Sequence, residues 1–206
     1  MPFAKKQDGM AGRLRNITGV ESLAPELDAK RIQLIRELVP GLKTLGLLYD
    51  ADDPGTPSHL SVAQSGAKTL SIGLVKLPLR SATDFDAPFS SAAPQRLDGL
   101  LIFTSVLTFT NFTRVAEFAH SQRLPTICEF AQLAEAGCLM SYGPTFAEFT
   151  ERVAHQVDRI LKGARPADLP FEQPTRYELV VNLKTAKAIG ATIPQLILLR
   201  ATRVIE

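Results

Sequence analysis

Seven polar side chains follow apolar runs of strand length, and they are the first candidates for chemistry in this chain. They are Asp50, Asp52, Thr104, Ser105, Glu129, Ser141 and Tyr142. In an open parallel sheet, ligands bind beyond the carboxyl ends of the strands. If the apolar runs form neighbouring parallel strands, these side chains share one edge of the sheet. The pattern therefore predicts a binding site for a small solute in this neighbourhood.

The aspartates after the first apolar run could instead chelate a cation. Counted from Asp50, Gly55 falls at the sixth position of an EF-hand loop, but Ser61 stands at the twelfth, where that loop needs glutamate. We interpret residues 50–55 as a turn that leads into a helix N-terminus, where carboxylates favour the positive end of the helix dipole. We expect neither a metal nor a cofactor.

Three of the candidates also have a purely structural interpretation. Glu129 could bind a ligand ammonium group, or it could be an acidic residue in the first turn of the helix that follows. Ser141 and Tyr142 could form hydrogen bonds to a ligand. Equally, Ser141 could cap the strand end while Tyr142 packs on the core. The sequence leaves both interpretations open.

Motifs for covalent or cofactor chemistry are missing from the sequence. It contains no Gly-x-Ser-x-Gly elbow, no Gly-x-Gly-x-x-Gly loop and no phosphate-binding Gly-x-x-x-x-Gly-Lys-Ser/Thr loop. No two of His59, His120 and His155 are four residues apart, and we interpret all three as surface residues. Cys128 and Cys138 form no Cys-x-x-Cys pair, and we expect two buried thiols.

The elements that must position these side chains alternate between strands and helices. Strands are expected at residues 44–49, 74–77, 99–103, 125–128, 138–142 and 177–181, and helices from Ser22 to Pro40 and at 57–70, 111–121, 129–135 and 145–163. A further helix start is expected at residues 81–84, and residues 104–110 are expected to be a loop. This alternation predicts an α/β fold with a mostly parallel sheet flanked by helices.

Composition sets the outer limits of what the chain can be. It has 206 residues, 45% of them hydrophobic, and a net charge of +2. These values suit one domain or two small lobes and give no electrostatic reason to expect a nucleic-acid partner. Residues 1–15 are expected to form an unstructured tail. They lack the apolar middle of a signal peptide, so the chain as written is expected to be cytoplasmic.

The chain resembles the ABC transporter substrate-binding protein family of the tryptophan/tyrosine-binding type from about Asn16 to its C-terminus. The matching segments are NITGV (16–20), LAPEL (23–27) with Lys30, Arg31 and ELVP (37–40), LMSYGP (139–144), ILKGA (160–164) with PADLP (166–170), EQPT (172–175), and ELVVN (178–182) with KTAK (184–187). The resemblance implies a type I periplasmic-binding fold, in which two α/β lobes joined by crossing strands close on a small solute. It also implies a secreted or lipid-anchored protein that delivers solute to an ABC permease and has no enzymatic activity.

The same resemblance implies that only part of such a protein is present. Residues 16–142 and 175–206 are expected to build the second lobe, and the crossover helix at 145–163 normally packs with a first lobe that this chain lacks. A truncated chain of this kind is expected to bind solute poorly. The apolar face of the crossover helix is then expected to mediate self-association. This face comprises Phe146, Phe149, Val153, Val157 and Leu161.

Three functional hypotheses remain at this point. The first is a solute-binding component, or a remnant of one, for a small solute such as an amino acid. The second is a flavodoxin-like enzyme that uses carboxylates at strand ends, and the third is a cytoplasmic module that senses a ligand and oligomerises. The missing nucleophile and phosphate-loop motifs argue against the second hypothesis.

Overall fold

The structure is a computed structural model that describes residues 16–21, 24–83, 85, 88–90 and 96–206. The chain divides into two compact units, and each is described by itself. Unit 1 comprises Met1–Ser22 and Pro144–Arg176, and unit 2 comprises Leu23–Gly143 and Tyr177–Glu206. The expected N-terminal tail, residues 1–15, lies outside the described residues.

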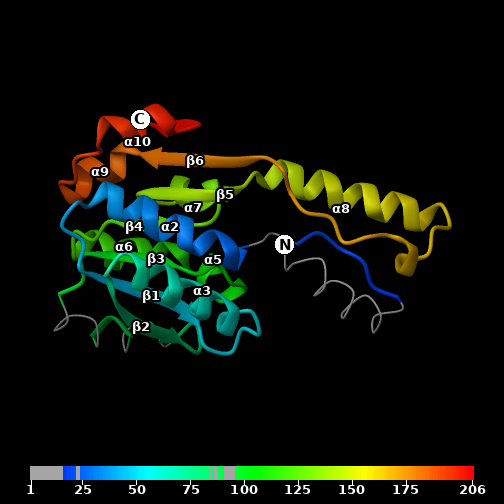
Figure 1. The fold of residues 1–206 in the computed structure, drawn as a ribbon, viewed down its shortest axis with the longest axis horizontal. Coiled ribbons are helices and arrows are strands. Elements are labelled where there is room, and N and C mark those ends of the chain that lie inside the picture. Colours follow the sequence, from blue (N-terminus) through cyan, green and yellow to red (C-terminus); the bar gives the residue numbers. More distant parts are fainter. Residues whose placement is uncertain (1–15, 22–23, 84, 86–87, 91–95) are drawn as a thin grey trace. The chain divides into compact units, whose positions relative to one another are not determined.

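Unit 2 is built on a seven-stranded sheet with the order β2-β1-β3-β4-β5-β6-β7 (Figure 1). The strands are β1 (Thr44–Asp50), β2 (Gly73–Leu79), β3 (Gly99–Ile102), β4 (Thr126–Cys128), β5 (Met140–Pro144), β6 (Tyr177–Asn182) and β7 (Arg203–Ile205). The pairs β1–β2, β1–β3, β3–β4, β4–β5 and β6–β7 are parallel. The predicted α/β fold with a mostly parallel sheet is therefore confirmed.

Strand β6 runs antiparallel to its neighbour β5. The amide of Asn182, at the end of β6, donates to the carbonyl of Leu139 just before β5 begins, at 2.9 Å. The ring of Tyr142 stacks on that of Tyr177, at the start of β6, with centroids 6.4 Å apart. The chain therefore leaves unit 2 at the carboxyl end of β5 and returns beside the same point.

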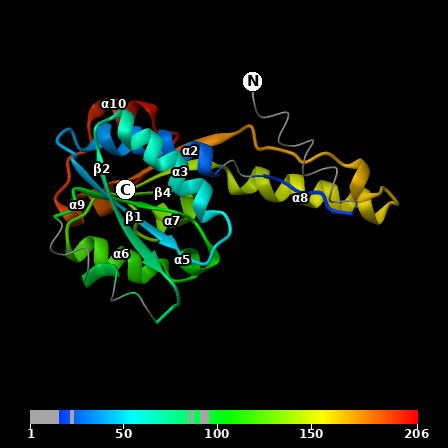
Figure 2. The ribbon, with the colours of Figure 1, turned by 60° about the horizontal axis from the view of Figure 1, so that its bottom comes forward.

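Helices cover both faces of the sheet (Figure 2). They are α2 (Ala24–Leu38), α3 (Thr56–Thr69), α5 (Val106–Thr110), α6 (Phe112–Ser121), α7 (Ala131–Glu135), α9 (Leu183–Ile189) and α10 (Gln195–Arg200). Leu45 and Leu47 of β1 belong to one apolar cluster with α2 and α3, and Leu48 belongs to a second cluster with α6. Successive side chains of a strand point to opposite faces, so a strand covered on both faces is apolar throughout.

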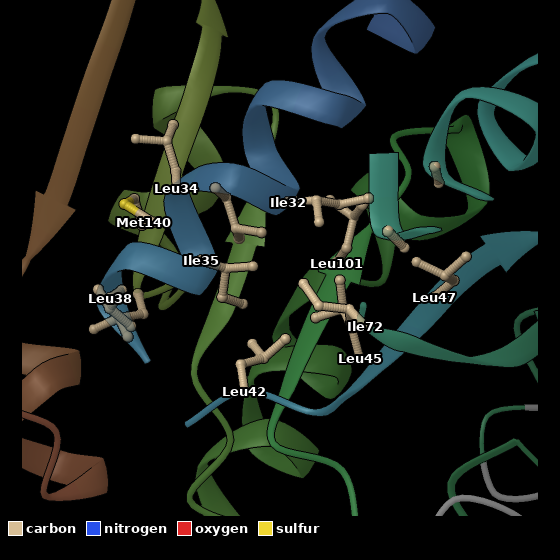
Figure 3. Packing of buried hydrophobic residues seen from close by; sticks show 14 of the residues in the cluster. Ile32, Leu34, Ile35, Leu38, Leu42, Leu45, Leu47, Ile72, Leu101 and Met140 are labelled. Carbon is tan, nitrogen blue, oxygen red and sulfur yellow. The ribbon is translucent and has the colours of Figure 1, made fainter. Parts of the chain in front are cut away.

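The larger apolar cluster lies between helices α2 and α3 and the sheet (Figure 3). Ile32 and Ile35 of α2 meet Leu45 of β1 and Leu101 of β3 there, and all four are fully buried. Burial of each such side chain contributes about 1.5–3 kcal/mol. This packing sets the height of α2 over the sheet and therefore the position of the polar residues on the same helix.

Two local predictions are wrong. Residues 104–110 are not all loop, because Val106–Thr110 forms helix α5. Its cap is reciprocal: the Ser105 hydroxyl accepts from the Thr108 amide and the Thr108 hydroxyl accepts from the Ser105 amide. The helix start expected at Ser81 is a bend and turn over residues 81–83, and residues 84, 86 and 87 lie outside the described part.

Unit 1 contains helix α8 (Phe146–Leu161) and a short 3-10 helix (Pro166–Asp168). Residues 16–21 also belong here, although the sequence grouped them with the second lobe. The reason is backbone pairing, since the Glu172 amide donates to the Gly19 carbonyl and the Glu21 amide to the Glu172 carbonyl. No helix among the described residues is both long and apolar enough to cross a bilayer. The assignment of α8 to a further lobe stays a prediction.

Candidate functional site

The sheet topology brings the ends of β1, β3, β4 and β5 to one edge. Asp50 ends β1, Thr104 and Ser105 follow β3, Glu129 follows β4, and Tyr142 lies near the end of β5. Because these four strands are parallel neighbours, their carboxyl ends lie side by side. The predicted grouping of strand ends is present in the structure. Contact with a ligand remains a prediction for each residue.

The aspartates after β1 build a turn. The Asp50 side chain accepts from the Asp52 amide at 3.0 Å, and the Asp53 side chain accepts from the Gly55 amide at 2.7 Å. Asp52 itself is exposed and lies 3.5 Å from Arg80. These contacts match the predicted turn into a helix, which begins as α3 at Thr56. Among the described residues, no group of three His, Cys, Asp or Glu side chains could hold a metal ion.

Two of the seven candidates are enclosed in the protein. Ser141 has no exposed surface, and Glu129 keeps only 3% of its own. One oxygen of each side chain, Ser141 Oγ and Glu129 Oε1, makes no hydrogen bond with the described residues. Such atoms are costly to bury without a partner, so an ordered water or a polar ligand group is the expected occupant beside them.

A buried arginine on α2 joins the elements of this edge. Arg31 Nε donates to the Tyr142 carbonyl at 2.8 Å, and its Nη1 donates to Asp28 Oδ1 at 2.7 Å. The guanidinium also lies 3.9 Å from Glu129 Oε1. The other oxygen of Asp28 contacts His59 Nδ1 at 2.6 Å. Side chains from α2 and α3 and from the segment after β4 therefore form one polar network with the backbone of β5.

Burial raises the pKa of Glu129, and the nearby charge of Arg31 opposes that rise. Arg31 thus stabilises two carboxylates, those of Asp28 and Glu129, inside the protein. Paired and hydrogen-bonded charges are the form in which buried ionic groups are tolerated. The network holds the end of β5 in place, because the Tyr142 carbonyl is one of its acceptors.

Gly143 brings the end of β5 against the segment after β4. A Cβ atom at this position would lie 2.4 Å from the Glu129 carbonyl oxygen. Only glycine allows this approach, so the residue following Tyr142 cannot carry a side chain without moving Glu129. The half-buried Tyr142 ring meanwhile packs against the larger apolar cluster and stacks on Tyr177.

The sequence analysis missed Asp28 and Arg31 and misjudged His59. His59 was expected on the surface, but it is buried, with its ring 4.7 Å from that of Phe103. Asp28 and Arg31 fall at helical spacing with Ile35 on the core-facing side of α2. Charged residues at core-facing helix positions are a signal of a buried network, and they could have been found from the sequence.

Unit 1 has a polar cluster of its own at the start of α8. Glu148 accepts from the amides of Thr175 and Arg176 and from Arg152 Nη2, the last at 2.8 Å. Burial by itself would raise the pKa of Glu148, but these hydrogen bonds lower it to about 2. Arg152 also pairs with Glu172 at 2.9 Å. The cluster ties α8 to the segment that leads into β6.

The sequence model of the ABC transporter substrate binding protein family matches residues 8–205. The chain belongs to this family. The tyrosine-binding protein of Clostridioides difficile (strain R20291) is 20% identical over 160 residues, which are 78% of this chain and 46% of that protein. This family consists of binding proteins, which agrees with the prediction of a substrate-binding protein.

Solved structures share the fold of this family member. A conserved domain protein from Vibrio cholerae O1 biovar El Tor superposes with a TM-score of 0.84 and 24% identity, over 91% of this chain and 62% of that one. An ABC domain in complex with L-Trp from Streptococcus pneumoniae gives a TM-score of 0.80 and 22% identity, over 93% and 67% of the two chains. The chain spans about half the length of the curated relatives that it matches.

Proposed function

We propose that this chain is a solute-binding component of an ABC-type uptake system and that its solute is an amino acid with an aromatic side chain. The family match over residues 8–205 carries this proposal. The names of two similar proteins support the solute class, because one binds tyrosine and the other was solved with L-Trp. The fold supports it as well, since the carboxyl edge of a parallel sheet is where ligands bind in such proteins.

The exposure of the candidates suggests which of them contact the solute and which support those contacts. Tyr142, Thr104 and Asp50 keep part of their surface open at the edge and are proposed to contact the solute. Glu129 and Ser141 are enclosed and are proposed to support them from behind. Ser105 and Asp52 serve the α5 cap and an exposed ion pair, which makes them weaker candidates for contact.

The partners of the protein follow from the same family. We propose an ABC permease as the acceptor of the solute, which places the working protein on the outer side of the membrane. Because the relatives contain more chain than the matched part, the 206 residues assayed alone are expected to bind more weakly than the relatives do.

A second proposal concerns a further copy of this chain. Val153, Val157 and Leu161 recur at helical spacing on α8 and are 39%, 49% and 83% exposed. Apolar stripes of this kind are typical of surfaces that another chain covers. We propose that α8 mediates self-association, which would also suit a ligand-sensing module that works as an oligomer.

The solute proposal is tested by calorimetric titration and thermal shift with L-tryptophan, L-tyrosine and glycine. Replacing Tyr142 by Ala is expected to weaken binding of the aromatic amino acids about tenfold, as the loss of one aromatic contact at a site does. Phe118→Ala is the matched control, since Phe118 is a half-buried ring on α6 that stacks on Phe89.

Loss of binding and loss of folding are distinguished in this experiment. Wild-type protein that folds but binds none of the probes would contradict the proposed function. With ligand absent, Tyr142→Ala is expected to melt at a lower temperature than wild-type protein, because Tyr142 also packs on the core. The affinity of the variant must therefore be compared with that of wild-type protein by titration below the melting range, where both proteins are folded. The loss of affinity there must exceed what the loss of folding stability explains.

A further inference from the structure

His59 is held at the carboxyl edge of unit 2 in a fixed orientation. Its Nδ1 lies 2.6 Å from Asp28 Oδ2, and its ring packs on that of Phe103 with centroids 4.7 Å apart. Phe103 directly follows β3, and His59 sits in the first turn of α3, whose Thr56 hydroxyl donates to the Asp50 carbonyl. The imidazole therefore lies beside the ends of β1 and β3.

The other ring nitrogen of His59 has no hydrogen-bond partner among the described residues. This nitrogen, Nε2, is not one of the enclosed polar atoms that lack a partner. The side chain keeps 10% of its surface exposed, whereas that of Asp28 keeps none. A ring locked through Nδ1 and unpartnered at Nε2 presents one polar atom to whatever occupies the edge.

The network behind the ring decides what that atom can do. Arg31 donates to Asp28 Oδ1 at 2.7 Å, and the second oxygen of Asp28 lies against His59 Nδ1. With Nδ1 donating to Asp28, Nε2 of the neutral ring is an acceptor.

The charges around His59 favour a cationic partner. Asp28 and Glu129 bring two carboxylates to the network and Arg31 brings one guanidinium. The carboxylates of Asp50 and Asp53 lie in the turn directly before α3, and the His59 ring approaches Gly55 of that turn. Carboxylates of this network together with an acceptor nitrogen suit an ammonium group.

We propose that His59 Nε2 accepts a hydrogen bond from the α-ammonium group of the bound amino acid, with Asp28 and Arg31 as its positioning residues. This inference rests on the proposed function and adds to it a contact residue and the part of the solute that it recognises. The sequence analysis did not include His59 among its candidates, so the assignment comes from the network alone.

The test compares two probes that differ at the α-ammonium group. L-tryptophan carries this group and indole-3-propionate lacks it, while both keep the indole ring and the carboxylate. Wild-type protein is expected to bind L-tryptophan at least about tenfold more tightly, since hydrogen bonds to charged groups contribute that much. In His59→Phe, which keeps a ring against Phe103, the preference is expected to fall below about threefold.

His155→Ala is the matched control, because His155 is an exposed histidine on α8. It is expected to keep the wild-type preference. An unchanged preference in His59→Phe, or no preference in wild-type protein, would overturn the inference while leaving the proposed function intact. Wild-type protein that binds neither probe would overturn both.

A measurement on wild-type protein covers the case in which His59→Phe fails to fold. The imidazole nitrogens of 15N-labelled histidine report protonation and hydrogen bonding in the NMR spectrum. The His59 Nε2 resonance is expected to shift on addition of L-tryptophan and to stay in place with indole-3-propionate. A shift of equal size with both probes would contradict a contact with the ammonium group.

Discussion

Arg31 illustrates how one side chain can hold several elements at the residue scale. It is fully buried, and its guanidinium reaches the carbonyl of Tyr142 as well as the carboxylate of Asp28. Removing one partner of a buried pair is far more costly than removing one of an exposed pair, because the remaining charge stays buried without compensation. The contribution of Arg31 to stability can therefore be separated from that of a surface arginine.

Replacement of Arg31 by Ala is expected to lower the free energy of unfolding by about 3–5 kcal/mol, as measured by urea denaturation. Arg80→Ala is the control, because Arg80 is 68% exposed and pairs with the exposed Asp52. Its expected cost is below about 1 kcal/mol. Equal losses in the two variants would contradict the view that the Arg31 network organises this edge.

Glu148 predicts how the folding stability changes at acid pH. Its pKa of about 2 in the folded protein lies below the ordinary value of 4.5, so the unfolded chain takes up the proton first. The stability that Glu148 contributes is therefore present above about pH 4.5 and is lost as the pH falls toward about 2. Circular dichroism with urea at several pH values is expected to show this loss in wild-type protein.

Two variants separate Glu148 from other acid effects. Glu148→Gln is expected to be less stable at pH 7 and to lose less stability between about pH 4.5 and 2. Glu151→Gln alters an exposed carboxylate of the same helix that pairs with Arg176, and it is expected to keep the wild-type pH profile. A wild-type profile in Glu148→Gln would show that other carboxylates cause the acid effect.

At the scale of elements, α8 differs from the other long helices. Helices α2 and α3 bury apolar side chains against the sheet, whereas the buried residues of α8 are Glu148 and Gln156. Its apolar stripe is exposed instead, and the charged residues of the helix lie on another side. An amphipathic helix of this kind is stable when something covers the stripe.

Light scattering tests whether a second copy covers the stripe. The wild-type chain is expected to form dimers or larger species as its concentration rises, and Val157→Lys is expected to shift it toward monomer by burying a charge in the interface. His155→Lys adds the same charge on an exposed part of α8 away from the stripe and should leave association unchanged. A wild-type monomer at high concentration would count against the proposal.

At the scale of the whole molecule, the two units rest on different interactions. The apolar clusters of the described residues belong to unit 2, while unit 1 is tied together largely by the hydrogen bonds of Glu148, Arg152 and Gln156. Apolar burial is the dominant source of folding stability, so the units are expected to differ in local stability.

Hydrogen exchange under native conditions checks this difference. Backbone amides of α8 are expected to exchange through openings that require less free energy than those of β1 and β3, whose residues are nearly all buried. Low concentrations of urea should lower the protection factors of the α8 amides first. Equal protection of α8 and β3 throughout would mean that the two units unfold together.

The fold was predictable because its signals are local. Unbroken apolar runs such as residues 44–49 mark strands covered on both faces, and the residues that end them mark turns. The error at residues 104–110 has a local cause as well. Polar, β-branched residues were taken as loop, although Ser105 and Thr108 form a reciprocal cap that begins α5.

The candidate site was predictable only as a neighbourhood. Asp50 ends β1, and Thr104 and Glu129 follow β3 and β4; parallel order puts these carboxyl ends at one edge. The exposure of each residue depends on which helices cover it. The sequence could not show that Ser141 is fully enclosed or that His59 is held in the interior through Asp28.

The sequence by itself determined the alternation of strands and helices, the family, and the edge of the sheet where a solute is expected. These properties follow from hydrophobic periodicity, turn chemistry and motifs, which act over a few residues at a time. Only the tertiary structure decided that Arg31 meets Tyr142, a residue 111 positions away, and that Asp28 orients His59. Those contacts depend on how α2 and α3 pack over the sheet, because side-chain contacts between distant segments are set by packing and not by local pattern.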